Sequence, residues 1–134
     1  MDLNMYAEEL LSSYENQKNK HKIEKPDAEM HEENVSCGDR ITVFLKITNG
    51  IVKDISYEGD GCVISMGSAN ILVEKLKGKR IDEIERMDRT GVIDTIHLDP
   101  GPVRMHCAAL SLKAVKEALF KYENKQVDRA TKEL

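Results

Sequence analysis

The residues of this chain that could carry chemistry are three cysteines, each at an expected junction between two elements. Cys37 lies in a turn, Cys62 ends a glycine-rich loop just before a helix, and Cys107 follows His106 in the first turns of a later helix. The positive end of a helix favours thiolate over thiol. Thiolates are the soft ligands that zinc and iron–sulfur clusters require, so the three positions predict a metal-binding function.

Asp39 and His106 extend the cysteines to five candidate ligands. Asp39 lies two residues beyond Cys37, so in an extended stretch both side chains face the same way, and Gly38 between them permits a close approach. A hairpin returns the chain to where it started, so the turn at Cys37 and the loop at Cys62 should lie at the same end of a sheet. If the last helix packs there, all five side chains can converge.

Each of these residues also has a simpler interpretation. Cys107 falls on the apolar stripe of its helix, where burial alone would explain a free cysteine. An aspartate after a glycine, as at Asp39, is typical of a plain turn, and His106 alone reads as an ordinary partly exposed histidine. No CxxC pair is present, so the usual spacing of a zinc ribbon is missing. The joint pattern is harder to explain by packing than any single member.

The elements that must position these residues predict an α+β fold, with a small antiparallel sheet of about three strands packed against several helices. Apolar and polar residues alternate from Ile41 to Thr48, Asn49-Gly50 suits a tight turn, and residues 51–57 return as a second strand. This central hairpin over 41–57 needs a neighbouring strand, for which the polar residues 28–34 are the candidate at an edge. We place the ligand site at one end of the sheet.

Helical spacing of apolar residues predicts the elements that cover the sheet. The helices are expected over residues 2–17, 63–77 and 81–87 and from Val103 onward. We expect residues 88–99 to be irregular, and Pro100-Gly101-Pro102 to exclude regular helix at that point. The chain of 134 residues predicts a single domain over 1–134, with a mobile N-terminal helix (2–17) and an exposed tail (121–134).

Composition and charge exclude several classes of partner. Asp plus Glu total 24 against 20 Lys plus Arg, which gives a net charge of −4, so nucleic acid is not an expected partner. No apolar run approaches the roughly 20 residues that cross a bilayer, so we expect no membrane partner. The N-terminus lacks the basic-then-apolar order of a signal peptide, which predicts a cytoplasmic protein with reduced thiols.

Three motifs in order resemble those of the iron–sulfur cluster assembly scaffold family, of the IscU, SufU and NifU N-terminal type. The resemblance covers nearly the whole chain, and the three cysteines are separated by 25 and 45 residues. The matching motifs are Cys37-Gly38-Asp39, Gly59-Asp60-Gly61-Cys62-Val63-Ile64-Ser65-Met66 and Pro102-Val103-Arg104-Met105-His106-Cys107-Ala108.

The resemblance implies a scaffold on which a [2Fe–2S] cluster is assembled and from which it passes to apo-proteins. Cys37, Asp39, Cys62, His106 and Cys107 would be its ligands. A cysteine desulfurase would supply sulfur as a persulfide on Cys107 or Cys37. Asp39 would make the cluster labile, because a carboxylate in place of a thiolate weakens a soft-ligand set. The same residues could bind Zn²⁺ in the purified protein.

Several points stay open from the sequence. The family's Leu-Pro-Pro-Val-Lys site for an Hsp70-type chaperone is Pro100-Gly101-Pro102-Val103-Arg104 here, which puts that partner in doubt. A homodimer is a further open possibility. The main alternative function is a SufU-like, zinc-dependent sulfurtransferase acceptor that stimulates a cysteine desulfurase, so whether the chain is an enzyme stays open, with a non-enzymatic scaffold favoured. A structural zinc module and a redox thiol enzyme are further alternatives.

Overall fold

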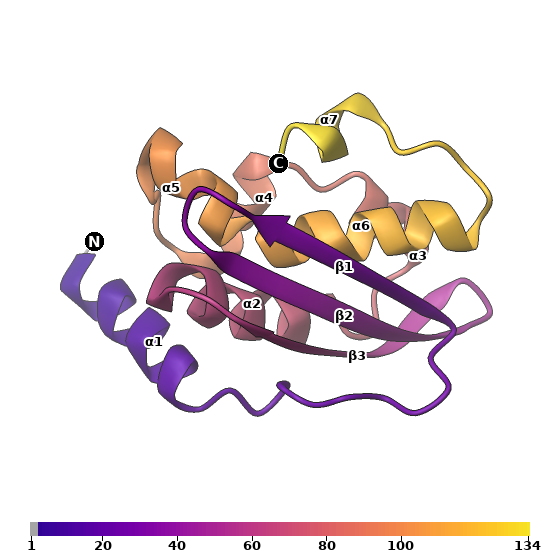
Figure 1. Ribbon diagram of the computed structural model, residues 1–134, viewed down its shortest axis with the longest axis horizontal. Helices are drawn as coiled ribbons and strands as arrows, with labels where there is room; N and C mark the ends of the chain where they lie inside the picture. The colour runs from indigo at the N-terminus through magenta and orange to yellow at the C-terminus, as the bar shows by residue number, and fades with distance from the viewer. Residues whose placement is uncertain (1–2) are drawn as a thin grey trace.

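A three-stranded antiparallel sheet with helices packed against it forms the framework of the computed structural model, which describes residues 3–134 (Figure 1). This arrangement confirms the predicted α+β class. The strand order is β1-β2-β3. The strands are β1 (Ala28–Asn34), β2 (Asp39–Thr48) and β3 (Ile51–Asp60).

The hairpin of β2 and β3 forms as predicted and is longer than expected, since it runs from residue 39 to residue 60. Asn49 and Gly50 both take positive φ values, 53° and 75°, which a two-residue turn between twisted strands requires. Alternate residues of β2 point into the core. These inward residues are Ile41, Val43, Leu45 and Ile47.

The polar segment 28–34 is the edge strand β1, paired antiparallel with β2. Along β1 exposed residues alternate with half-buried ones, and none is fully buried. An edge strand covered on one face by a helix can therefore be as polar as this one, because few of its side chains enter the core.

The helices differ in number from the prediction. They are α1 (Leu3–Glu15), α2 (Val63–Leu76), α3 (Ile81–Glu85), α4 (Arg89–Ile96), α5 (Gly101–Ala108), α6 (Leu110–Tyr122) and α7 (Arg129–Lys132). Asp2, where we expect the first helix to begin, lies outside the described residues, as do the side chains of Leu3 and Tyr6.

Two expectations about residues 88–102 are wrong. Residues 89–96 form α4. The Asp88 carboxylate caps this helix by accepting a hydrogen bond from the backbone N–H of Gly91 at 3.3 Å. Val92 and Ile96, one turn apart, are buried and hold the helix against the core. Helix α5 begins within the Pro-Gly-Pro stretch. Pro102 is tolerated there because backbone N–H groups in the first turn of a helix have no acceptor within the helix. A proline, which lacks an N–H, therefore costs no hydrogen bond at this position.

The helical pattern after Val103 forms two helices rather than one. Helix α5 ends at Ala108, and α6 begins at Leu110, with Ala109 between them. Most of the tail over 121–134 is exposed, but Thr131 and Leu134 are buried. The Asp128 carboxylate caps α7, and Leu134 joins the core, so the end of the chain is held against the molecule.

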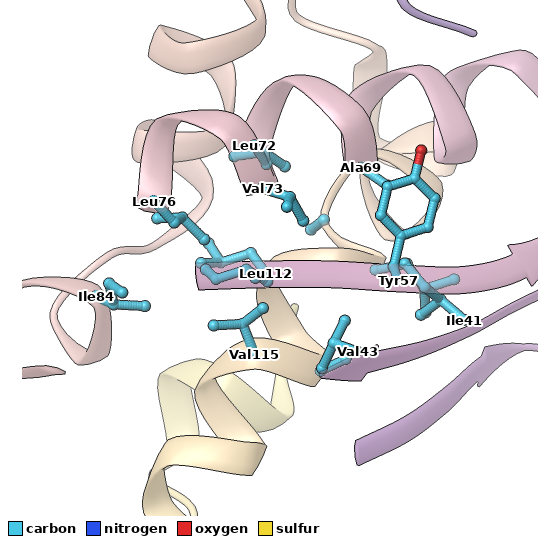
Figure 2. Packing of buried hydrophobic residues seen from close by; sticks show 14 of the residues in the cluster. Ile41, Val43, Tyr57, Ala69, Leu72, Val73, Leu76, Ile84, Leu112 and Val115 are labelled. Carbon is cyan, nitrogen blue, oxygen red and sulfur yellow. The ribbon is translucent and has the colours of Figure 1, made fainter. Parts of the chain in front are cut away.

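The core lies between the sheet and helices α2 and α6. Figure 2 shows side chains of α2 and α6 close to inward residues of the strands, with Ile84 of α3 at one end of the cluster. Leu72, Val73, Ile84, Leu112 and Val115 are all fully buried. Their burial holds α2 and α6 against the sheet.

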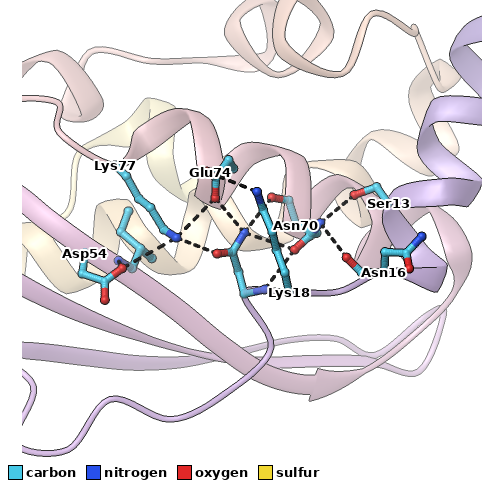
Figure 3. A network of polar contacts seen from close by, with 9 residues as sticks. Ser13, Asn16, Lys18, Asp54, Asn70, Glu74 and Lys77 are labelled. Carbon is cyan, nitrogen blue, oxygen red and sulfur yellow. Dashed lines mark hydrogen bonds and ion pairs between the residues drawn. The ribbon is translucent and has the colours of Figure 1, made fainter.

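Helix α1 and the connector after it are attached to α2 by polar contacts (Figure 3). The Ser13 hydroxyl donates to the carbonyl of Gly67 at 3.0 Å, and the Asn70 amide donates to Ser13 Oγ at 3.1 Å. Asn19, itself buried, donates to Asn70 Oδ1 at 3.1 Å and to Glu74 at 3.1 Å. Among the described residues, no helix has the length and apolar character needed to cross a membrane.

Candidate metal centre

The β1–β2 turn, the first turn of α2 and helix α5 meet at one end of the sheet, at the left of Figure 1. Cys37 lies in the turn, where its N–H donates to the carbonyl of Asn34 at 3.2 Å. Gly38 takes a φ of 72°, which reverses the chain into β2. The turn therefore directs Cys37 and Asp39 toward the helices at this end of the sheet.

Cys37, Asp39 and Cys107 each offer one ligand atom, and these three atoms lie within 4.8 Å of one another. The Cys107 thiol donates to Cys37 Sγ, with 3.3 Å between the two sulfurs. Cys107 and Asp39 are fully buried, whereas Cys37 is partly exposed. Residues 70 positions apart thus form one group of donors that opens to solvent at Cys37.

Asp39 also ties the second cysteine loop to the sheet. Its Oδ1 accepts a hydrogen bond from the backbone N–H of Cys62 at 2.9 Å. Gly61 passes so close that a Cβ there would lie 2.7 Å from the same oxygen, which explains why this loop position has no side chain. The glycine-rich loop therefore allows Cys62 to approach the buried carboxylate.

Cys62 lies at this end of the sheet but outside the group of three donors. It is the N-cap residue of α2, and its Sγ accepts from the backbone N–H of Ser65 at 3.4 Å. Cys62 is partly exposed. The thiol occupies the position where a helix offers free N–H groups and partial positive charge.

Asn34 is a site residue that the sequence analysis missed. Its amide Nδ2 lies 3.3 Å from Cys107 Sγ and 3.4 Å from Asp39 Oδ2. Asn34 ends β1 directly opposite Asp39 in the strand register. That register was the signal that could have identified it, because cross-strand partners bring their side chains together.

Arg104 and His106 border the site on α5, and both are exposed. A hydrogen bond to Cys107 and the charges of Cys37 and Cys62 raise the pKa of Arg104. The guanidinium therefore lies within electrostatic reach of all three thiols. His106 lies beside Cys107 in the chain but is not in the group of three donors.

Burial raises the pKa of the Cys107 thiol, and its contacts with Cys37 and Asp39 raise it further. A ligating thiol must be deprotonated, so metal uptake here would displace a proton from Cys107. Two thiols and a carboxylate suit zinc or an iron–sulfur cluster, since both take thiolate ligands and accept an oxygen donor. The donor set therefore fits a metal or cluster of this kind.

Fold and site together define a class, namely small α+β proteins with a thiol-rich candidate metal site at one end of a three-stranded antiparallel sheet. The family model described as NifU-like N terminal domain matches residues 5–129. The chain belongs to this family, the IscU and NifU N-terminal family of iron–sulfur cluster scaffolds.

Relatives by sequence cover most of the chain. The iron–sulfur cluster assembly scaffold protein IscU of Thermotoga maritima is 38% identical over 135 residues, which cover 87% of this chain and 94% of that protein. The protein of the same name from Escherichia coli K12 is 29% identical over 125 residues, with 90% and 96% covered.

Two crystal structures share the fold. One is a candidate SUF-system scaffold protein from Fervidobacterium islandicum AW-1, with a TM-score of 0.73 and 26% identity over 88% of this chain and 99% of that one. The other is the N-terminal part of a NifU-like protein from Brucella abortus, with a TM-score of 0.75 over 92% and 97%. At 21% identity it supports the fold alone.

Proposed function

We propose that this chain is a scaffold on which a [2Fe–2S] cluster is assembled and from which it is transferred. The observation that carries the proposal is the meeting of Cys37, Asp39 and Cys107 within 4.8 Å, in a chain 38% identical to a scaffold protein of that name. The cluster is cargo rather than a resident cofactor, so the site has to bind it and release it.

The ligands proposed for the cluster are the three cysteines, with Asp39 or His106 as the remaining donor. Cys62 would join Cys37 and Cys107 by releasing the Ser65 N–H that its sulfur now accepts. A set of four thiolates holds a cluster firmly, whereas an oxygen or nitrogen donor leaves one weaker position. Asp39 is the residue that would make release possible.

The partners follow from the same role. A cysteine desulfurase would supply sulfur as a persulfide on Cys37 or Cys107, and apo iron–sulfur proteins would receive the finished cluster. Cys37 is the partly exposed member of the pair, so it is the cysteine that a second protein could reach. Zn²⁺ would bind the same donors when iron and sulfur are absent.

Substitution of Asp39 tests the scaffold role. We expect Asp39→Ala to lengthen the half-life of a bound cluster on the order of tenfold and to slow its transfer to an apo-ferredoxin. The measurement is anaerobic reconstitution with a desulfurase, cysteine and ferrous iron, followed by visible and Mössbauer spectroscopy. Asp39→Asn is the matched variant, because an amide oxygen can still accept the Cys62 N–H while the charge is lost.

A second candidate function is a zinc-dependent acceptor that stimulates a cysteine desulfurase without building clusters. The position of Cys62 favours it, since Cys37, Asp39 and Cys107 without Cys62 form a set of three ligands with a fourth place open. In that case Asp39→Ala would mainly weaken zinc binding and sulfur relay. Reconstitution that yields no cluster absorbance, together with a faster desulfurase, would replace the scaffold proposal with this one.

A further inference from the structure

We propose that Cys107 is a resolving thiol, which attacks a persulfide carried on Cys37 and releases its outer sulfur as sulfide. The inference rests on the proposed function, because it assumes that the site receives sulfur. It goes further by dividing the roles of the two neighbouring cysteines. It also assigns a reductive step to the pocket. Sulfur arrives as the outer atom of a persulfide and is released as sulfide, which is the form of sulfur in a cluster.

The distance between the two sulfurs carries the proposal. Cys107 Sγ lies 3.3 Å from Cys37 Sγ, within the roughly 3–3.5 Å separation of reacting atoms in a near-attack arrangement. A disulfide needs an approach to about 2.05 Å. Cys37 can supply that movement because it lies in a four-residue turn, partly exposed, beside Gly38. The sulfur of Cys62 is instead engaged with Ser65.

Burial sets the order of events. Cys37 is partly exposed, so a persulfide donor can reach it from solvent. Cys107 has no exposed surface, so its thiol meets sulfur only through the pocket, where Cys37 is its neighbour. Cys37 therefore receives the sulfur first, and Cys107 acts second.

The step balances within the pocket. Cys107 Sγ attacks Cys37 Sγ, a bond forms between them, and the bond from Cys37 Sγ to the outer sulfur breaks. The outer sulfur leaves with the electron pair and takes the proton of the Cys107 thiol, which gives HS⁻. That sulfur is reduced by two electrons, and the two cysteine sulfurs are oxidised to a disulfide. An external dithiol reductant then restores both thiols before the next sulfur arrives.

Two further side chains suit this step. The Asn34 amide lies 3.3 Å from Cys107 Sγ and orients the attacking sulfur. Arg104 lies exposed on α5, three residues before Cys107 and at the border of the site, so its guanidinium can stabilise the anionic persulfide and the departing HS⁻. Both are positioning residues for the attack, since neither exchanges a bond.

The test uses a small-molecule sulfur donor, so it needs neither a desulfurase nor a cluster. The full chain is loaded anaerobically with glutathione persulfide and cleared by rapid desalting. Released sulfide is then trapped with monobromobimane, and the cysteine pairing is mapped by mass spectrometry of peptides. We expect close to one sulfide per loaded chain and a peptide that links Cys37 to Cys107.

Two variants sharpen the result. Cys107→Ser should keep the persulfide on Cys37 and slow sulfide release at least tenfold, whereas Ser36→Ala, at an exposed position in the same turn as Cys37, should still release sulfide. Unchanged release from Cys107→Ser, a wild-type persulfide that settles on Cys107, or a disulfide that includes Cys62 would each overturn the proposal. The pairing in the wild-type chain decides the matter even if a variant folds poorly.

This experiment, combined with the anaerobic reconstitution described above, separates this inference from the scaffold role. Sulfide release with the Cys37–Cys107 pair, in a chain that builds no cluster, would retain the resolving thiol and reject the scaffold. A chain that builds a cluster but forms no such disulfide would do the reverse.

Discussion

At the scale of single residues, the two carboxylate oxygens of Asp39 have different neighbours. Oδ1 accepts the Cys62 N–H at 2.9 Å, while Oδ2 lies 3.4 Å from the Asn34 amide. Asp39 is fully buried, so an unpaired carboxylate there would be costly. The residue that would weaken a cluster therefore also keeps two of the cysteine-bearing segments together.

We expect Asn34→Ala to weaken zinc binding about tenfold. Residues that hydrogen-bond to the ligands of a metal, without touching the metal, commonly contribute about 10–100-fold to its affinity. The amide lies near both Cys107 and Asp39, so its loss loosens two donors at once. Competition titration with a chromogenic chelator measures the change. Glu33→Ala, an exposed neighbour on β1, is the control, and equal affinities in the two variants would contradict the role of Asn34.

The sequence predicted that Cys37, Asp39 and Cys62 lie at one end of the sheet, because a glycine turn and a returning hairpin constrain these positions. It brought Cys107 to them only on the condition that the last helix packs at that end. It could not predict Asn34, whose role depends on the register of a weak edge strand. Nor could it predict that Cys62 caps α2 with its sulfur, since the orientation of that side chain depends on loop geometry. The sequence thus indicated candidate donors, three of which the structure brings together, but it did not indicate how these three are held.

At the scale of elements, the contact of α1 with α2 depends on the absence of a side chain at Gly67. A Cβ at this position would lie 2.7 Å from the carbonyl oxygen of Leu10 and 3.0 Å from its Cδ1. The Ser13 hydroxyl bonds the carbonyl of the same glycine. The two helices can therefore approach closely at this one place.

We expect Gly67→Ala to loosen α1, with a loss of about 1–3 kcal/mol in the free energy of unfolding, because the clash is with backbone. Hydrogen exchange of the α1 amides and urea denaturation measure the effect. Gly91→Ala in α4 is the matched control, since its Cβ would meet no backbone but only the Met87 side chain, whose flexible end is nearest at 3.3 Å. In that variant the helix propensity of alanine should leave stability unchanged or slightly higher. Equal protection of α1 in both variants would refute the prediction.

The helices and strands differ in how clearly their own residues predict them. The β2–β3 hairpin was predictable because alternation and an Asn-Gly turn both point to it. Helix α4 was missed because its eight residues bury only Val92 and Ile96, too few to show a clear stripe. A helix from Val103 onward was expected, but the start of α5 at Gly101 was not, because prolines usually interrupt helices and only its position in the first turn makes Pro102 compatible with one.

At the scale of the whole molecule, a pair of carboxyl groups joins the edge strand β1 to helix α6, one of the two helices that enclose the core. Burial, followed by a hydrogen bond to Glu32 of β1, raises the pKa of Glu117 on α6 from 4.5 to about 8, with Lys113 acting in the opposite direction. Glu117 is therefore protonated in the folded chain at pH 7, while the unfolded chain would release that proton.

Because the folded state binds the extra proton, the contribution of Glu117 to stability is fully present below about pH 4.5 and is lost as pH rises toward 8. We expect Glu117→Gln, whose amide can donate to Glu32 at any pH, to be more stable than the wild type at pH 8 by on the order of 1–2 kcal/mol. At pH 5 the two should be nearly equal. Urea denaturation from pH 5 to 8 measures the difference, and parallel curves would contradict the pairing.

The connector between α1 and β1 has a consequence for self-association. Its Lys20 bridges to Tyr57 on the outer side of β3, where the Tyr57 N–H donates to the carbonyl of Asn19 at 3.0 Å. That border of the sheet is thus shielded, while the opposite border carries the exposed Glu29 and Glu33, which repel a second copy of themselves. Concentrated solutions of this chain should therefore resist strand-to-strand polymerisation into fibrils.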